Sequence, residues 1–236
     1  MEAVTIQKQY YERTAERYDA MHLDPTVDTE HILALHFLSS MITYLDIKSV
    51  LDIGAGTGRT IDFLKHQHPH LIVVGIEPVA ALRQKGYEKG IEKAALIDGD
   101  GNNLTFKDNA FDLVCEFAVL HHVPQPAVMV SEMLRVSKKA IFISDSNNFG
   151  QGGFLSRSFK QALNSVGLWQ TFNYIRTGGK NFQISEGDGL YYSYSIFNNY
   201  NQIKKSCKDV HLLNLKNSQP DLYRTTSNVA LLGIKK

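Results

Sequence analysis

The amino-acid sequence predicts an α/β protein built on a mostly parallel sheet. The main observation is the stretch at residues 50–59, VLDIGAGTGR, in which an apolar run is interrupted by Asp52 and three glycines follow at alternate positions. This pattern is typical of a buried parallel strand, a tight turn and a helix whose N-terminus faces the turn. A second observation is that short apolar runs and helical patterns alternate as far as Trp169, as they do in strands joined by crossover helices.

Length and composition favour one domain in the cytoplasm. The 236 residues have room for one α/β domain and a small lid. Because 25 Lys and Arg nearly balance 24 Asp and Glu, neither nucleic acid nor an anionic membrane is expected as a partner. No run has the length of a membrane span, and the N-terminus lacks the apolar region of a signal peptide. Cys115 lies in an apolar run far from Cys207, so no disulfide is expected.

Residues 2–20 predict a helix with one aromatic face. Its members follow helical spacing: Tyr11, Ala15 and Tyr18. This face can simply pack on the domain, or it can close over a ligand. Asp24-Pro25 then breaks the chain, and Asp28-Thr29 is expected to cap a helix that ends near Leu45.

The residues around the glycine turn favour a sulfonium ligand over a dinucleotide. Residues 49–53 are the first predicted strand, and residues 57–68 the helix that follows. A dinucleotide fingerprint would place its third glycine where this chain has Arg59. Asp52, two residues before the first glycine, would repel a pyrophosphate but suits a ligand that carries an ammonium and a sulfonium group.

A second apolar run, at residues 71–76, predicts a fully buried strand that ends at Glu77. An acid at the carboxyl end of that strand can accept hydrogen bonds from both hydroxyls of a ribose. Pro78 fits the first turn of the next helix, which is expected to run to about Gly90. Residues 94–97 predict a short third strand. Glu77 therefore favours a nucleoside ligand without choosing between the two ligand classes.

Two histidines follow the fourth predicted strand, residues 111–117. The carboxyl end of a parallel strand faces the ligand crevice, so residues 116–122 should border the reacting atoms. Residues 126–136 predict an amphipathic helix. Its inward positions are expected to be Val128, Met129, Met133 and Leu134. The fifth strand, at residues 140–144, ends in a polar run that either holds a substrate or only turns the chain.

The last part of the chain predicts a helix at about 154–168, a polar insert near 170–195, a helix at 197–207 and strands at 210–215 and 229–234. The insert is rich in glycine, acids and tyrosines. Such loops often carry substrate contacts, although a surface hairpin whose tyrosines shield the core is the alternative.

Taken together, these motifs resemble the class I S-adenosylmethionine-dependent methyltransferases, in particular the small-molecule branch like type 11. The resemblance covers about residues 10–145 by motif and the rest by strand order. It rests on the glycine turn, on Glu77, on the Gly-Asp…Asn-Leu-x-Phe pattern at 99–106 and on the Leu-His-His-Val segment at 120–123. Thr105 stands where the family usually has proline, and Gly101-Asn102 replaces a more usual Ala-Glu.

The resemblance implies a Rossmann-like three-layer sandwich with a seven-stranded sheet whose last strand is antiparallel. Residues 1–236 would form one domain, with a helical cap at 1–45, a cofactor-binding core at 46–145 and an acceptor side at 146–236. The cofactor would be S-adenosyl-L-methionine. The residues implied to bind it are Tyr11, Tyr18, Asp52, Gly54, Ala55, Gly56, Glu77, Asp100, Gly101 and Glu116.

His122 is the leading candidate for a general base, because an imidazole takes up a proton near neutral pH. His121 is the alternate. The candidate substrate residues are Asp145, Asn147, Glu186, Asp188 and Tyr191. No Cys/His cluster has metal-ligand spacing and the acids of the insert look isolated, so no metal is expected.

The expected function is transfer of a methyl group to an O or N of a small polar metabolite, such as a sugar or a natural-product intermediate. The protein would act as a monomer or homodimer. Two alternatives remain at this point. One is an inactive methyltransferase-like subunit that binds the cofactor as a partner or sensor, and the other is an NAD-dependent oxidoreductase, against which Arg59 and Asp52 argue.

Overall fold

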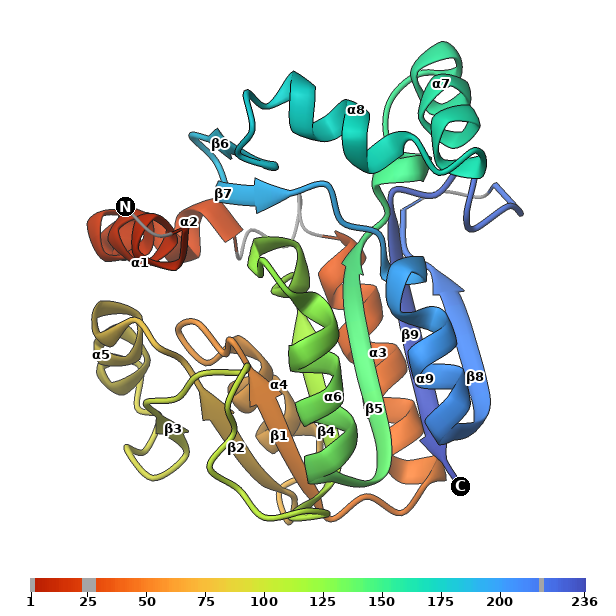
Figure 1. The fold of residues 1–236 in the computed structure, drawn as a ribbon. Coiled ribbons are helices and arrows are strands. Elements are labelled where there is room, and N and C mark those ends of the chain that lie inside the picture. Colours follow the sequence, from red (N-terminus) through yellow and green to blue (C-terminus); the bar gives the residue numbers. More distant parts are fainter. Residues whose placement is uncertain (1–2, 23–28, 217–218) are drawn as a thin grey trace.

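The structure is a computed structural model that describes residues 3–22, 29–216 and 219–236. In this part of the chain the main sheet has seven strands in the order β3-β2-β1-β4-β5-β9-β8 (Figure 1). The strands are β1 Ser49–Ile53, β2 Ile72–Ile76, β3 Leu96–Ile97, β4 Phe111–Phe117, β5 Ser137–Ser146, β8 Cys207–Asn214 and β9 Asn228–Lys235. Strands β1 to β5 pair in parallel, whereas β9 is antiparallel to both β5 and β8. The predicted sheet, with its antiparallel last strand, is confirmed.

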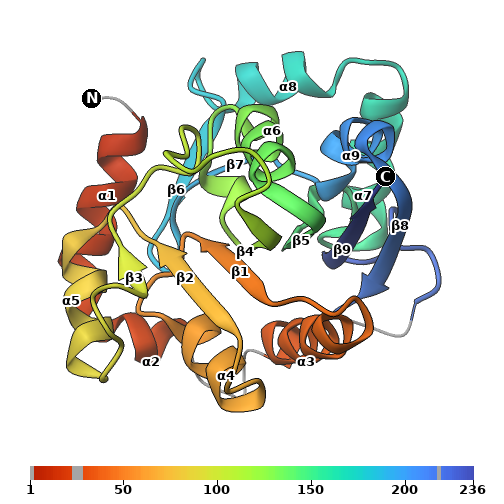
Figure 2. The ribbon, with the colours of Figure 1, turned by 90° about the horizontal axis from the view of Figure 1, so that it is seen from below.

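Helices cover both faces of this sheet (Figure 2). The α-helices are α1 Ala3–Thr14, α2 Tyr18–His22, α3 Thr29–Tyr44, α4 Arg59–Gln67, α5 Ala80–Glu88, α6 Pro126–Val136, α7 Phe154–Ser165, α8 Trp169–Arg176 and α9 Tyr200–Ser206. Apolar side chains of α3 and α4 join one core cluster, and those of α6 and α9 join the other. Along β5, Ala140 and Phe142 belong to the first cluster and Ile141 and Ile143 to the second. Both faces of the strand are therefore buried, which explains its continuous apolar run.

Two details of the predicted burial are wrong. Ile72 was expected inside a fully buried strand, but its side chain is 62% exposed. It is the first residue of β2, at the rim of the sheet where no helix covers it, and the neighbouring Leu71 is buried instead. Val128 was expected to face inward on α6 but is 41% exposed, because Val130 occupies the inward position beside Met129 and Met133.

The first or last residues of several predicted strands and helices also differ from those in the structure. Strand β5 runs from Ser137 to Ser146, longer at both ends than predicted, and α7 ends at Ser165 rather than near residue 168. The proposed break at Asp24-Pro25 and the cap at Asp28 lie outside the described residues. Among the described residues, no helix has both the length and the apolar character needed to cross a bilayer.

A cap lies over the carboxyl ends of the parallel strands (Figure 1). It combines α1 and α2 with a hairpin of β6 Phe182–Ser185 and β7 Gly189–Tyr192. Three hydrogen bonds join the N-terminal helix to the hairpin: the Leu190 backbone N–H donates to Oε1 of Gln7 at 2.5 Å, Nε2 of Gln7 donates to the Asp188 carbonyl at 3.1 Å, and the Tyr10 hydroxyl donates to the Glu186 carbonyl at 2.6 Å. The predicted polar insert is therefore the hairpin and α8, and it is tied to the N-terminal helix.

Candidate active site

The glycine turn after β1 has the backbone that its sequence requires. Gly54, Gly56 and Gly58 have φ angles of +70°, +55° and +87°, in the left-handed region that favours glycine. A Cβ on Gly56 would lie 2.7 Å from the hydroxyl oxygen of Tyr18. The turn is thus covered closely by the N-terminal cap, and a larger residue at position 56 would collide with it.

Glu77 follows the last residue of β2, and its carboxylate is hydrogen-bonded to the backbone of the glycine turn. Its Oε2 accepts a hydrogen bond from the Gly56 N–H at 3.0 Å, and its Oε1 accepts one from the Val79 N–H at 2.8 Å. Burial raises the pKa of Glu77 to about 7, against these two hydrogen bonds. The carboxyl group is therefore fixed at the carboxyl end of β2, as a ribose acceptor would need to be.

The cleft beside this turn has a volume of about 150 Å³. Six of the residues predicted to bind the cofactor line it: Tyr11, Tyr18, Gly54, Glu77, Asp100 and Gly101. Ligand pockets are usually larger, roughly 300–1,000 Å³. The rings of Tyr11 and Tyr18 form part of the wall, so a movement of the N-terminal cap would widen the cleft.

Asp100 lies in the turn that follows β3. Its Oδ1 accepts from the backbone N–H and the side-chain amide of Asn102, both at 2.9 Å. Those bonds fit the alternative of a polar turn, yet the residue also borders the cleft. The next residue, Gly101, lies against the floor, where an added Cβ would meet Met129 at 2.5 Å and Ile53 at 2.7 Å.

The other four predicted cofactor residues, Asp52, Ala55, Gly56 and Glu116, do not line the cleft. Asp52 and Glu116 are buried, and burial raises the pKa of Asp52 to about 7. Burial and the nearby Asp145 carboxylate raise the pKa of Glu116 as well. Each keeps one carboxyl oxygen without a hydrogen-bond partner among the described residues. These two acids lie behind the turn and the strand end rather than at the cleft surface.

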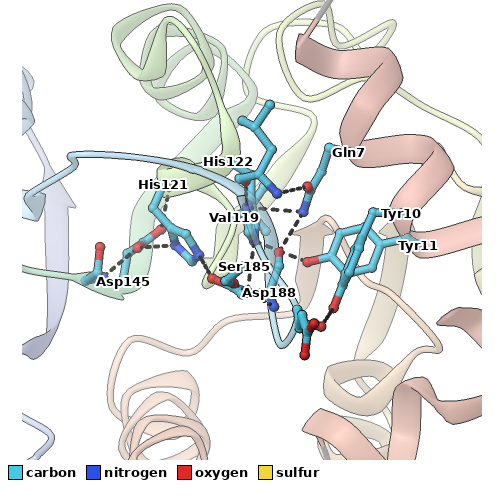
Figure 3. A network of polar contacts seen from close by, with 12 residues as sticks. Gln7, Tyr10, Tyr11, Val119, His121, His122, Asp145, Ser185 and Asp188 are labelled. Atoms are coloured by element: carbon cyan, nitrogen blue, oxygen red, sulfur yellow. Dashed lines mark hydrogen bonds and ion pairs between the residues drawn. The ribbon is translucent and has the colours of Figure 1, made fainter. Parts of the chain in front are cut away.

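His122 lies in the short helical turn Leu120–His122 and faces the N-terminal helix (Figure 3). Its Nδ1 is 2.5 Å from the Leu190 carbonyl oxygen. A carbonyl only accepts, so Nδ1 must carry the proton and a neutral ring has its lone pair on Nε2. Nε2 lies 3.1 Å from the Tyr11 hydroxyl and 3.4 Å from the Asp188 carboxylate. The ring is thus held in the tautomer that can accept a proton at Nε2.

His121 has a different environment. Its Nδ1 lies 2.7 Å from Oδ1 of Asp145, and its Nε2 lies 3.2 Å from Oδ2 of Asp188 (Figure 3). Burial alone would lower the pKa of His121, but the two carboxylates outweigh it and raise the pKa well above its usual value. The same contacts hold the pKa of Asp188 well below its usual range, against the effect of burial. Both ring nitrogens of His121 face carboxylate oxygens, which only accept, so the contacts favour the doubly protonated ring as a bridge between two carboxylates.

Three of these side chains could hold a metal ion. One nitrogen of His121, one of His122 and a carboxylate oxygen of Asp188 lie within 4.8 Å of one another. The expectation that the acids of the insert are isolated is therefore wrong for Asp188. Sequence spacing could not reveal this contact, because the hairpin brings Asp188 back over the histidines from 67 residues away.

A second, larger cavity of about 770 Å³ lies above the sheet. Four residues line both this cavity and the cofactor cleft: Tyr11, Tyr18, Phe117 and Ala118. Ala118 has a φ of +59°, an uncommon value outside glycine, at the point where β4 ends. His122 borders only the cleft, whereas His121 borders only the larger cavity. The two cavities therefore adjoin at the histidine pair.

Of the predicted substrate residues, Asp145, Asp188 and Tyr191 line the larger cavity. Asn147 and Glu186 do not. The Asn147 amide is buried and donates to the carbonyls of Leu222, Tyr223 and Thr226, so it ties two segments of the fold together. The Glu186 carbonyl accepts from Tyr10.

Sequence reasoning missed Gln7, which is one of the residues that fix this site. Its Nε2 donates to the Asp188 carbonyl at 3.1 Å, while its Oε1 accepts from the Leu190 N–H. Gln7 precedes Tyr11 by four residues and so lies on the same face of α1. That spacing was the available signal, but a lone glutamine in an N-terminal helix does not stand out.

A glycine turn, an acid at the end of the next strand and a crevice at the carboxyl ends of parallel strands define a Rossmann-like nucleoside-binding fold. Residues 51–143 match the family model of a methyltransferase domain. This match and the fold of known S-adenosylmethionine-dependent methyltransferases agree with the resemblance to class I S-adenosylmethionine-dependent methyltransferases, for which the cofactor is S-adenosylmethionine. The resemblance predicted from the sequence is confirmed.

Two curated relatives illustrate the sequence similarity. A phosphatidylethanolamine N-methyltransferase from Cereibacter sphaeroides is 35% identical over 107 residues, which cover 43% of this chain and 51% of that protein. A demethylmenaquinone methyltransferase from Thermotoga maritima is 30% identical over 106 residues, 44% of each chain. The chain thus spans about half the length of the curated relatives that it matches.

The fold similarity extends further. One similar structure is a magnesium protoporphyrin IX methyltransferase from Synechocystis PCC 6803 with bound S-adenosylhomocysteine. The match covers 100% of this chain and 100% of that protein, with a TM-score of 0.63 and 13% identity. An S-adenosylmethionine-dependent methyltransferase from Thermotoga maritima covers 97% of this chain and 99% of its own, with a TM-score of 0.57 and 20% identity.

Proposed function

We propose that this protein transfers the methyl group of S-adenosylmethionine to an O or N of a small polar acceptor, releasing S-adenosylhomocysteine. The observation that carries the proposal is the junction of the two cavities. The cleft beside the glycine turn and Glu77 adjoins the larger polar cavity, and His122 with Tyr11 lies at that boundary. Such a junction suits a reaction in which a donor on one side meets an acceptor on the other.

In this proposal His122 takes the proton of the acceptor. When bound, the cofactor supplies an electrophilic methyl group on its sulfonium. The acceptor O or N forms a bond to that carbon while the carbon–sulfur bond breaks, and its proton passes to Nε2 of His122. Nε2 carries the lone pair that accepts this proton, because the Leu190 carbonyl holds the proton of the neutral ring at Nδ1. The Tyr11 hydroxyl at 3.1 Å keeps Nε2 oriented before the acceptor arrives.

His121 and Asp188 are assigned a positioning role. His121 is charged and bridges Asp145 and Asp188, so it is not available as a base at neutral pH. The bridge holds the hairpin over the reaction site and helps to exclude water. The three side chains that could hold a metal also contact one another, and the proposed proton transfer to His122 includes no step on a metal. Transfer should therefore persist after dialysis against a chelator.

The acceptor class is supported by the cavity, not by the relatives. The cavity has about 770 Å³ and carries polar groups from several elements, including Asp145, Asn173 and Tyr191. The two curated relatives are named for phosphatidylethanolamine and demethylmenaquinone, so their names do not single out one acceptor. A polar metabolite such as a sugar or natural-product intermediate fits the polar lining.

Two measurements test the proposal. S-adenosylhomocysteine should raise the melting temperature, since a ligand at a hundred times its dissociation constant adds about 2.7 kcal/mol to the free energy of unfolding. NAD should not. Radiolabelled methyl transfer to a library of hydroxyl and amine acceptors then separates an enzyme from a partner or sensor subunit. Stabilisation by NAD alone would point to an oxidoreductase, and cofactor binding without transfer to any acceptor would favour a non-catalytic subunit.

A further inference from the structure

Helices α7 and α8 carry apolar side chains on their outer faces. On α7 and the turn after it, Leu155, Phe159, Ala162 and Val166 follow at intervals of four, three and four residues, which places them on one side of a helix. None of the residues of α7 is buried. Leu155 is 81% exposed, so this side of α7 faces away from the core.

A second row continues from the first. Leu168, Phe172 and Ile175 are spaced by four and three residues along α8. The rings of Phe159 and Phe172 lie 5.3 Å apart, so the two rows meet. Ile175 is 72% exposed. The result is one surface, here called the α7–α8 apolar surface, made of Leu155, Phe159, Val166, Leu168, Phe172 and Ile175.

Trp169 packs the surface against the rest of the protein. Below it, Trp169 is buried, its ring lies 5.9 Å from that of Phe149, and its indole N–H donates to the Ser193 hydroxyl at 2.9 Å. Helices α7 and α8 form the outermost layer beyond the carboxyl ends of the strands (Figure 1). The apolar side chains are therefore presented by an anchored element.

All the charged residues of the segment that contains α7 and α8 are basic. Between Ser146 and Ser185 the sequence has no Asp or Glu, and it has four basic residues: Arg157, Lys160, Arg176 and Lys180. These four exceed the net charge of +1 of the entire chain, so the remainder is net acidic. The even balance that argued against an anionic membrane partner conceals this local excess.

We infer that the α7–α8 apolar surface docks on an anionic lipid bilayer, with Leu155 and Ile175 entering the interface and Arg157 and Lys180 near the headgroups. Amphipathic helices with exposed leucine, isoleucine and phenylalanine beside basic residues bind at such interfaces, through apolar burial together with attraction to anionic lipid. A protein partner would need matching acids, and a second copy of the chain would place basic segments against each other. The bilayer satisfies both the apolar and the basic groups.

Docking would also place the large cavity beside the bilayer. Ser156, Lys160 and Trp169 of the same two helices line that cavity. The inference itself does not depend on the methyl-transfer reaction, so each can fail without the other.

Sedimentation of the 236-residue protein with sucrose-loaded vesicles tests the inference. Vesicles of equimolar phosphatidylglycerol and phosphatidylcholine should carry the protein down at low salt, and vesicles of phosphatidylcholine alone should not. The double variant Leu155→Asn and Ile175→Asn should bind roughly tenfold more weakly or worse. The matched control is Tyr44→Asn with Ile72→Asn, two exposed apolar residues at the opposite end of the molecule, and it should bind as the wild type does.

Charge is tested in the same assay. Arg157→Gln with Lys180→Gln should weaken binding and reduce its salt dependence, whereas Lys138→Gln with Lys208→Gln, exposed lysines at the other end, should not. Absence of wild-type sedimentation with the anionic vesicles at low salt overturns the inference. Equal binding by the α7–α8 variants and their controls also overturns it, as does a dimer that the Leu155 and Ile175 changes dissociate in the absence of vesicle binding.

Discussion

The Tyr11 hydroxyl and Nε2 of His122 lie 3.1 Å apart, although 111 residues separate them in the sequence. The contact joins the N-terminal helix to the end of the fourth strand of the sheet. Since the Leu190 carbonyl fixes the proton on Nδ1, the Tyr11 hydroxyl is the donor and Nε2 the acceptor. The N-terminal helix therefore supplies part of the proposed reaction site as well as its cover, and the first prediction follows from that.

His122→Ala should keep its affinity for S-adenosylhomocysteine and lose about 10²–10⁴-fold in the rate of methyl transfer, because the proton acceptor is removed. Tyr11→Phe keeps the ring but not the hydroxyl, so a smaller loss is expected. Single-turnover transfer and calorimetric binding measure the two effects. His66→Ala, an exposed histidine on α4, is the control. Near wild-type transfer by His122→Ala would remove His122 from the role of base.

Glu77→Ala should weaken the binding of S-adenosylhomocysteine by about 1.5–3 kcal/mol, the usual contribution of a hydrogen bond to a charged group. Glu77→Gln keeps an oxygen that accepts from Gly56 or Val79 and so better preserves the turn, which separates loss of charge from loss of shape. Titration calorimetry gives the affinities, with the exposed Glu92→Ala as control. An unchanged affinity in folded Glu77→Ala would place the ribose contact elsewhere.

The stability of the ligand-free protein should fall as the pH rises from about 5 to 8. Burial raises the pKa of both Asp52 and Glu77 to about 7, from ordinary values of 3.8 and 4.5. The folded state therefore holds these protons more tightly than the unfolded state. The resulting stability is fully present below the unfolded pKa values and is lost as the pH passes through about 7.

Melting temperatures measured across this range check the pH prediction. Asp52→Asn and Glu77→Gln should each flatten the fall, because neither amide titrates. The raised pKa of His121 also makes stability fall as the pH rises, so a residual slope is expected in both variants. A melting temperature that rises between pH 5 and 8 in the wild type would contradict the raised pKa values.

Gln7→Ala should release the hairpin from the N-terminal helix. The change removes the acceptor of the Leu190 N–H and the donor to the Asp188 carbonyl. Hydrogen exchange in residues 182–192 should become faster, and transfer should slow, while the global melting temperature changes little. Gln84→Ala, an exposed glutamine on α5, is the control. Unchanged exchange in the hairpin would mean that other contacts hold it.

The sheet and the cofactor class could be predicted because their signals are local. The alternating glycines, Glu77 and the apolar runs each reflect a backbone or burial requirement within a few residues. The errors at Ile72 and Val128 have a shared origin. An apolar residue at the rim of the sheet, or one position further round a helix, looks the same in the sequence as a buried one. Whether its side chain is buried depends on the elements that pack against it.

The arrangement of the site could be predicted only in part. His122 and Asp188 were named as separate candidates, but their contact depends on how a hairpin folds back over the strand ends. The role of His121 depends on two carboxylates from different segments, which no spacing rule brings together. The basic residues beside the apolar face of α7 were overlooked for another reason. The net charge of the whole chain is nearly zero and does not show that residues 147–184 contain basic residues but no acidic ones.

The bond between Gln7 and the Leu190 N–H spans 183 residues, and this has a consequence for protein synthesis. Strands β1, β2 and β3 pair with their neighbours in the sequence, and β4 pairs with β1, so all four are made well before the hairpin emerges from the ribosome. The N-terminal helix, although made first, waits for the hairpin to emerge before it finds its partner, since distant contacts form after local ones. A nascent chain that stops before the hairpin therefore has strands β1 to β5 but lacks the contacts that complete the proposed site.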